Sequence, residues 1–187
     1  MEPIRMKVDE CALLPLEMEI VEGLNGIIKR EIQDDRDYDR SEWTKNVKEV
    51  LADIGRRHGC KVSASGIGNP DDSEWMLDMV WATECGEEDE EGRGAYLEEI
   101  IFGMECEWNQ SEEELDWDFQ KLLAVRTKYR VFVFGQANER AVISVFKRCR
   151  EQMLNFKQSQ VGDRYLLAGC WNECGKFKVN LFEVKSE

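Results

Sequence analysis

Two glutamates, Glu105 and Glu107, stand one residue apart at the end of the apolar run 100–104. In a β-strand the side chains alternate between faces, so both carboxylates would share one face. Met104, Cys106 and Trp108 would then point to the other face. Two like charges in one small space need a cation, a proton or a basic side chain between them. A divalent metal ion is the leading candidate for that partner.

A third acid, Asp78, interrupts the apolar run 75–81. A lone buried carboxylate is costly, so Asp78 should have a cation, a proton or several hydrogen-bond donors beside it. If the strands that carry Asp78 and Glu105 are antiparallel neighbours, the two acids could meet at one end of the pair.

The elements that must position these acids follow from the hydrophobic patterns and the turn signals. Helices are predicted over residues 16–32 and 41–59, with Ser41 as the cap of the second, and later over 111–123 and 138–157. Strands are predicted over residues 60–65, 74–83, 96–108, 130–135, 164–171 and 176–184. The run 130–135 is apolar on both faces, which is typical of a central parallel strand covered by helices.

This order of elements predicts an α/β fold with a mixed central sheet flanked by helices. We interpret residues 1–187 as a single domain. Residues 1–40 would form an N-terminal helical extension, 41–135 the core, and 136–187 a helix plus a C-terminal hairpin.

The pattern resembles the PD-(D/E)xK nuclease superfamily, the restriction-endonuclease-like fold. The resemblance rests on an aspartate in the second core strand, Glu-x-Glu on the third, then a helix and a buried strand, and it covers roughly residues 41–135. It implies that Asp78 and Glu105 hold Mg²⁺ or Mn²⁺, with Glu107 as a further ligand. Two or three carboxylates plus waters and a substrate phosphate suit Mg²⁺.

The chain departs from the family pattern at two positions. Glu107 stands where the family usually has its lysine, and Leu77 replaces the proline before the aspartate. In some members the basic residue lies on the following helix, where Lys121 or its neighbour Gln120 would take that role. An acid from the first core helix often completes such a site, and Glu42 and Glu49 are the candidates.

Composition restricts the partners. The net charge of −14 disfavours tight nonspecific binding to nucleic acid, although basic segments such as 126–130, 147–150 and 56–57 could form a local groove. Much of the acidic excess lies in 84–91, predicted to be a solvated loop. The apolar runs are too short for a membrane span, the first residues do not resemble a signal peptide, and the seven cysteines indicate free thiols, so we expect a cytoplasmic protein.

Other candidate chemistry is weaker. Cys170 and Cys174 could form half of a metal or redox site, but their spacing is also typical of a hairpin end. The single histidine, His58, is interpreted as a residue of a helix C-terminus rather than a catalytic base.

The sequence is compatible with two functions. The first is a metal-dependent nuclease acting on nucleic-acid phosphodiesters, and the second is a non-catalytic protein that keeps the fold and binds a protein partner through its acidic surface. The three acids could also simply face solvent. The sequence is compatible with a homodimer.

Overall fold

The computed structural model describes residues 6–33, 39–68, 75–86, 94–171 and 174–186. Seven strands form one sheet in the order β1-β7-β6-β5-β4-β3-β2. In chain order the elements are β1 (Met6–Glu10), α1 (Pro15–Gln33), α2 (Arg40–Arg57), β2 (Lys61–Ala64), β3 (Met79–Cys85), β4 (Tyr96–Glu107), α3 (Glu112–Ala124), β5 (Tyr129–Gln136), α4 (Glu139–Asn155), β6 (Arg164–Trp171) and β7 (Lys178–Ser186).

The centre of the sheet is parallel and its two sides are antiparallel. Strands β4, β5 and β6 run in the same direction, whereas β2, β3, β7 and β1 pair antiparallel with their neighbours. Residues 131–134 of β5 are buried on both faces, as predicted for a central parallel strand. The predicted fold class, an α/β fold with a mixed sheet flanked by helices, is confirmed.

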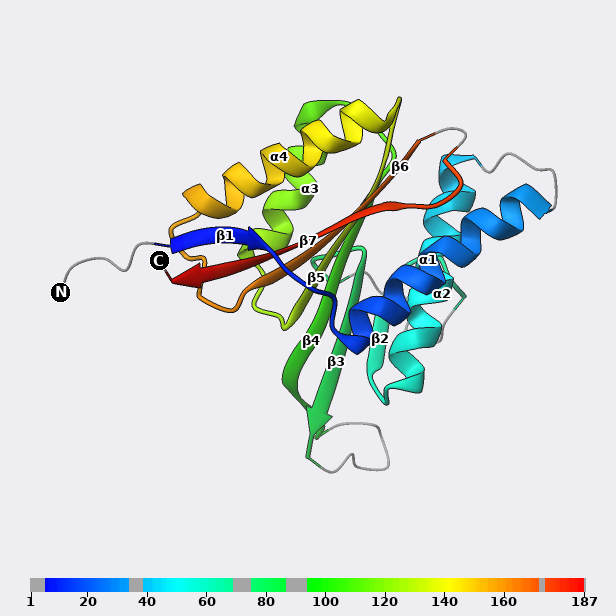
Figure 1. Ribbon diagram of the computed structural model, residues 1–187. Coiled ribbons are helices and arrows are strands. Elements are labelled where there is room, and N and C mark those ends of the chain that lie inside the picture. Colours follow the sequence, from blue (N-terminus) through cyan, green and yellow to red (C-terminus); the bar gives the residue numbers. More distant parts are fainter. Residues whose placement is uncertain (1–5, 34–38, 69–74, 87–93, 172–173, 187) are drawn as a thin grey trace.

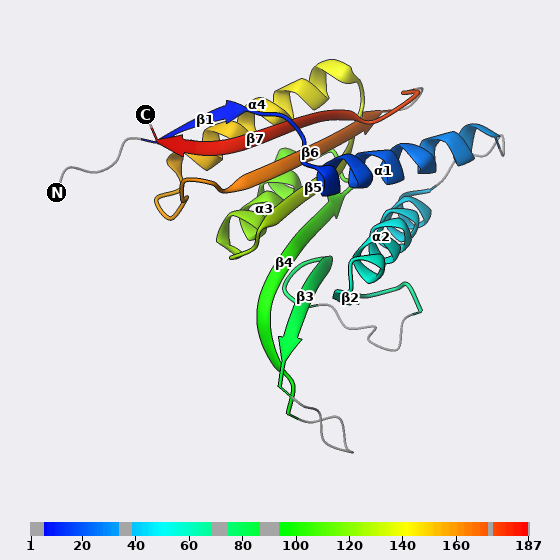
Figure 2. The same ribbon diagram turned by 60° about the horizontal axis from the view of Figure 1, so that its bottom comes forward.

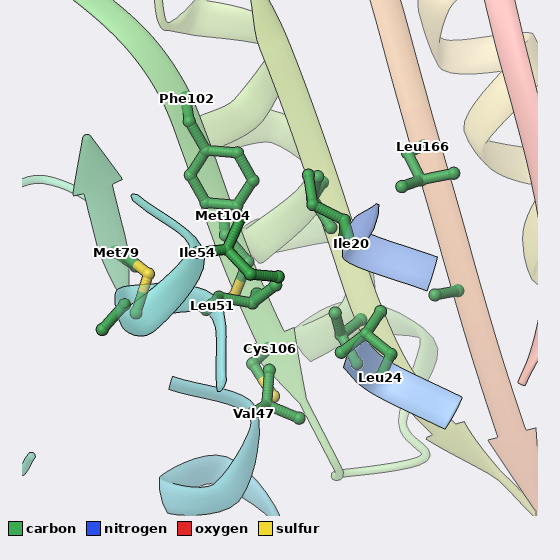
Figure 3. Packing of buried hydrophobic residues seen from close by; sticks show 14 of the residues in the cluster. Ile20, Leu24, Val47, Leu51, Ile54, Met79, Phe102, Met104, Cys106 and Leu166 are labelled. Carbon is green, nitrogen blue, oxygen red and sulfur yellow. The ribbon is translucent and has the colours of Figure 1, made fainter. Parts of the chain in front are cut away.

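Two helices cover each face of the sheet. Helices α1 and α2 lie together on one side, and α3 and α4 lie on the other (Figures 1 and 2). The first layer encloses a core in which Leu24 of α1, Leu51 of α2 and Met104 of β4 meet (Figure 3). The second layer buries Phe119 of α3 against Phe132 of β5. Burial of these apolar side chains on both faces is the main favourable contribution to folding.

Two local predictions were wrong, and one strand was not predicted. The cap of α2 is Asp39, which forms a capping box with Glu42, and not Ser41. Strand β3 begins at Met79, because Trp75 and Leu77 form an isolated bridge around Met76, whose φ of 62° is incompatible with an extended strand. Strand β1 was not predicted, because its five residues are mostly polar and only Val8 is buried.

Candidate metal and catalytic site

Glu105 lies at the centre of the candidate site. Alternation along β4 turns Met104 and Cys106 into the core beneath α1 and α2 and places Glu105 on the face covered by α3. The side chain of Glu105 is 1% exposed. Its Oε2 accepts a hydrogen bond from Lys121 Nζ of α3 at 2.7 Å. The basic side chain that the paired acids required therefore comes from the following helix.

Lys121 joins Glu105 to a second carboxylate. Its Nζ lies 2.8 Å from Oδ1 of Asp118, one turn earlier on α3. Asp118 in turn shares a side-chain hydrogen bond with Glu107, which also accepts one from the backbone N–H of Asn109. Asp118 was not predicted from the sequence, although residues three apart on a helix are neighbours and Asp118 precedes Lys121 by three.

Asp78 is held by a cation from the opposite layer. Its Oδ1 lies 3.1 Å from Nζ of Lys48 on α2, and its Oδ2 accepts the backbone N–H of Cys106 at 2.9 Å. Lys48 is 5% exposed, and its Nζ also donates to Ser65 Oγ at 3.3 Å. The requirement of Asp78 for a cation and a donor is thus met, but by a lysine that the sequence analysis did not consider.

The helix that carries Lys48 was expected to supply an acid instead. Glu42 takes part in the capping box of α2, and Glu49 lies 3.8 Å from Lys45 on the helix surface. Lys48 precedes the buried Leu51 by three residues, so it lies on the apolar face of α2. A lysine within an apolar helical face was the signal that could have identified it.

Burial and neighbouring acids perturb the titration of the site. Burial raises the pKa of Glu105 to about 8, and the nearby Asp78 adds to this effect, against the opposing influence of Lys121. Burial and the contact with Asp118 also raise the pKa of Glu107. Burial alone would lower the pKa of Lys121, but hydrogen bonds to Asp118 and Glu105 raise it above its usual range. Lys121 is therefore protonated at neutral pH.

The donor set suits a hard cation. Among the described residues, the four carboxylates of Asp78, Glu105, Glu107 and Asp118 face two ammonium groups, those of Lys48 and Lys121, so two negative charges remain unbalanced when all are ionised. Glu105 Oε1 is buried and has no hydrogen-bond partner within the described part of the chain. No group of three His, Cys, Asp or Glu side chains arranged for a metal ion occurs among the described residues. Mg²⁺ commonly uses only one or two carboxylates, with waters and substrate phosphates completing its shell. Asp78 and Glu105 are the residues that could hold such an ion, because their carboxylate oxygens are the ligand type that Mg²⁺ prefers.

The remaining candidates do not join this site. Gln120 is exposed on α3. His58 follows the last turn of α2, where its Nε2 lies 2.7 Å from Glu19. Cys170 and Cys174 form a hydrogen-bonded thiol pair at the end of the β6–β7 hairpin, and the hydrogen bond from Cys170 lowers the pKa of Cys174.

The charged segments are largely engaged in local pairs. Arg56 and Arg57 bind acids of α2 and α1, and Arg148 binds acids of α3. Arg126 and Arg130 lie together at the far end of α3. In the acidic segment 84–91, Glu84 pairs with Lys61, and residues 87–91 lie outside the described residues.

Comparisons with known proteins provide no family for this chain. No family model, curated protein or solved structure matches it. Within the described residues, no helix has the length and apolar character that crossing a membrane requires.

Proposed function

We propose that this chain is a metal-dependent nuclease-like protein that acts on nucleic-acid phosphodiesters. The observation that carries the proposal is the placement of Lys121 from α3 on the buried Glu105, with Asp78 close enough to influence the same carboxylate. Acid, acid and lysine are the groups expected from the resemblance to PD-(D/E)xK nucleases, with the lysine supplied by the helix rather than by the strand.

Asp78 and Glu105 would hold Mg²⁺ or Mn²⁺, and Glu107 is the third acid on the same strand face. The metal would supply an activated water and neutralise charge on the phosphoryl oxygens. Lys121 is protonated, so it can donate hydrogen bonds to a water or to a phosphate oxygen but cannot accept a proton. Asp118 fixes the position of Lys121, and Glu107 holds Asp118 through their shared hydrogen bond.

A second candidate function is supported by the ion pairs themselves. Lys48 pairs with Asp78, and Lys121 donates a hydrogen bond to Glu105, so these two acids have partners without any metal. A protein that retained the fold and lost catalysis would have this arrangement. Its acidic surface would then bind a basic protein partner.

Calorimetry with Mn²⁺ tests the metal site. We expect the wild type to bind Mn²⁺ and Asp78→Ala to lose at least about tenfold in affinity, because one of two charged ligands is removed. Asp53→Ala is the matched control, since Asp53 is an exposed aspartate on α2 that pairs only locally with Arg56. Absence of heat from the wild type, or equal heats for the wild type and Asp78→Ala, would refute the metal site.

Cleavage assays separate the two functions. Wild-type protein with Mn²⁺ should cut single- or double-stranded DNA or RNA, and Lys121→Met should bind Mn²⁺ but cut at least about a hundredfold more slowly. If the wild type binds no metal and cuts nothing, the interaction protein is favoured. A specific partner captured equally by the wild type and by the triple alanine variant of Asp78, Glu105 and Glu107 would support that alternative.

A further inference from the structure

Arg130 is a buried cation with unused hydrogen-bond donors. It lies at the beginning of β5 and is 3% exposed. Its Nη2 donates to the carbonyl of Val125 at 3.0 Å and lies 3.2 Å from Oδ1 of Asp163. Its Nε and Nη1 are buried and have no partner among the residues that the structure describes. A buried N–H group without a partner is costly, more so when it belongs to a charged group.

A cavity lies beside Arg130, which is one of its lining residues. It has a volume of about 400 Å³ and lies between the end of α3 and the connection from α4 to β6. Its charged lining residues are Arg126, Arg130, Lys157 and Asp163, so it carries three cations and one carboxylate. Their sum is a local charge of +2 in a chain of net charge −14.

The fold holds the guanidinium of Arg130 in place from several sides. The ring of Tyr165 lies 4.9 Å from it, which is a favourable cation–π distance. The hydroxyl of Tyr165 is also buried and has no partner within the described ranges. Val125 and Asp163 both engage Nη2, so Nε and Nη1 have no partner within the described ranges.

A neighbouring cavity shares Arg126, Arg130 and Asp163 but has a different character. Its volume is about 550 Å³, and Glu98 and Glu99 of β4 line it. These acids would repel an anion. The cavity of about 400 Å³ is therefore the one suited to a negatively charged ligand.

We propose that this cavity binds the phosphate group of a nucleotide, either free or at the end of a nucleic-acid strand. The cavity is lined by the guanidinium groups of Arg126 and Arg130 and the ammonium group of Lys157, which are the charged donors that bind phosphate in proteins. A phosphate monoester dianion matches the local charge of +2. The volume lies within the range of small-molecule sites and exceeds what a phosphate group alone would fill.

Binding measurements in EDTA test this site separately from the proposed metal site. Calorimetric titrations would use inorganic phosphate, a nucleoside 5′-monophosphate, and a short single-stranded oligonucleotide with either a 5′-phosphate or a 5′-hydroxyl. We expect the 5′-monophosphate or the 5′-phosphorylated strand to bind at least about tenfold more tightly than inorganic phosphate, because the rest of the nucleotide fills the cavity. If the free nucleotide binds more tightly than the 5′-phosphorylated strand, the ligand is a free nucleotide. If the strand binds more tightly and requires its 5′-phosphate, the ligand is the end of a nucleic-acid strand.

The double variant Arg126→Gln, Lys157→Gln removes two rim cations without altering buried Arg130. Its affinity for the phosphate compounds should fall at least about tenfold, since each charge-assisted hydrogen bond contributes roughly that factor. The matched control is Arg56→Gln, Lys147→Gln, which removes the same residue types from exposed positions on α2 and α4. Arg130→Lys, which keeps the charge but has fewer N–H donors, should also weaken binding.

The outcomes are distinct. No binding of any phosphate compound by the wild type, or an equal loss in the two double variants, would overturn the proposal. The titrations are made in EDTA, so the metal site does not contribute to them. The anion site can thus fail while the metal site stands, and the reverse also holds.

Discussion

Replacing Glu105 with glutamine should change how the stability of the protein depends on pH. Glu105 is 1% exposed, and its pKa is raised from 4.5 to about 8 by burial and by Asp78. The amide of glutamine has nearly the shape of the protonated carboxyl group but does not ionise. The variant therefore removes one titration and leaves the packing around β4 and α3 nearly unchanged.

The direction of the pH dependence follows from how many protons the folded and the unfolded protein bind. Between pH 4.5 and about 8, the folded protein holds a proton on Glu105 that the unfolded chain has released. The free energy of unfolding of the wild type should therefore decrease as pH rises through this window, by about 1.4 kcal/mol per pH unit. Over the whole window the loss from this group is about 5 kcal/mol. The glutamine variant should lack this contribution.

Urea unfolding in EDTA at several pH values from 4.5 to 8.5 measures the effect. The stability of Glu105→Gln relative to the wild type should rise with pH across the window. The control is Glu98→Gln, an exposed glutamate on the same strand, which should keep the wild-type profile. Parallel profiles for the wild type and Glu105→Gln would contradict the prediction that Glu105 is protonated, because they would mean that Lys121 outweighs burial and keeps Glu105 ionised.

Three further variants test the charges and contacts that hold the layers together, each by urea unfolding at pH 7. Lys48→Met should lower the free energy of unfolding by about 1–3 kcal/mol, because it leaves the partly buried carboxylate of Asp78 without its cation; an unchanged stability would contradict this. Arg164→Ala should lower it by about 3–5 kcal/mol, since its guanidinium lies 2.8 Å from Glu17, which is 2% exposed and anchors α1; an unchanged midpoint would exclude that role. Gly55→Ala should cost about 1–2 kcal/mol despite the better helix propensity of alanine, because the new Cβ would lie 2.7 Å from the ring of Trp81; a gain in stability would show that the ring can move.

The parts of the fold that depend on local pattern were predictable from the sequence. Alternation of side chains placed Glu105 and Met104 on opposite faces of β4, and apolar residues on both faces of β5 indicated a parallel strand. These features depend on a few consecutive residues. The edge strand β1 escaped detection because an edge needs few apolar residues, and its pairing with β7 joins opposite ends of the chain.

The cation partners of the acids were harder to predict because they come from other elements. Lys48 reaches Asp78 from a helix that ends 21 residues earlier in the chain, and only the sheet brings the two together. Lys121 was identified as a candidate, although helical geometry placed it off the buried face. The side chain of Lys121 is long enough to reach Glu105 from this position, because lysine extends its charged end away from its own backbone.

Helix α3 connects the two proposed sites, which are of opposite charge. Its last turn carries Lys121 to the acidic site, and the carbonyl of Val125, just beyond its end, accepts a hydrogen bond from Arg130. The C-terminal end of a helix carries a partial negative charge, which would disfavour an anion nearby. The hydrogen bond from Arg130 to the carbonyl of Val125 offsets that negative charge. A cation at the acidic site and a phosphate beyond the end of α3 are therefore electrostatically compatible, and a shift of this helix would disturb both.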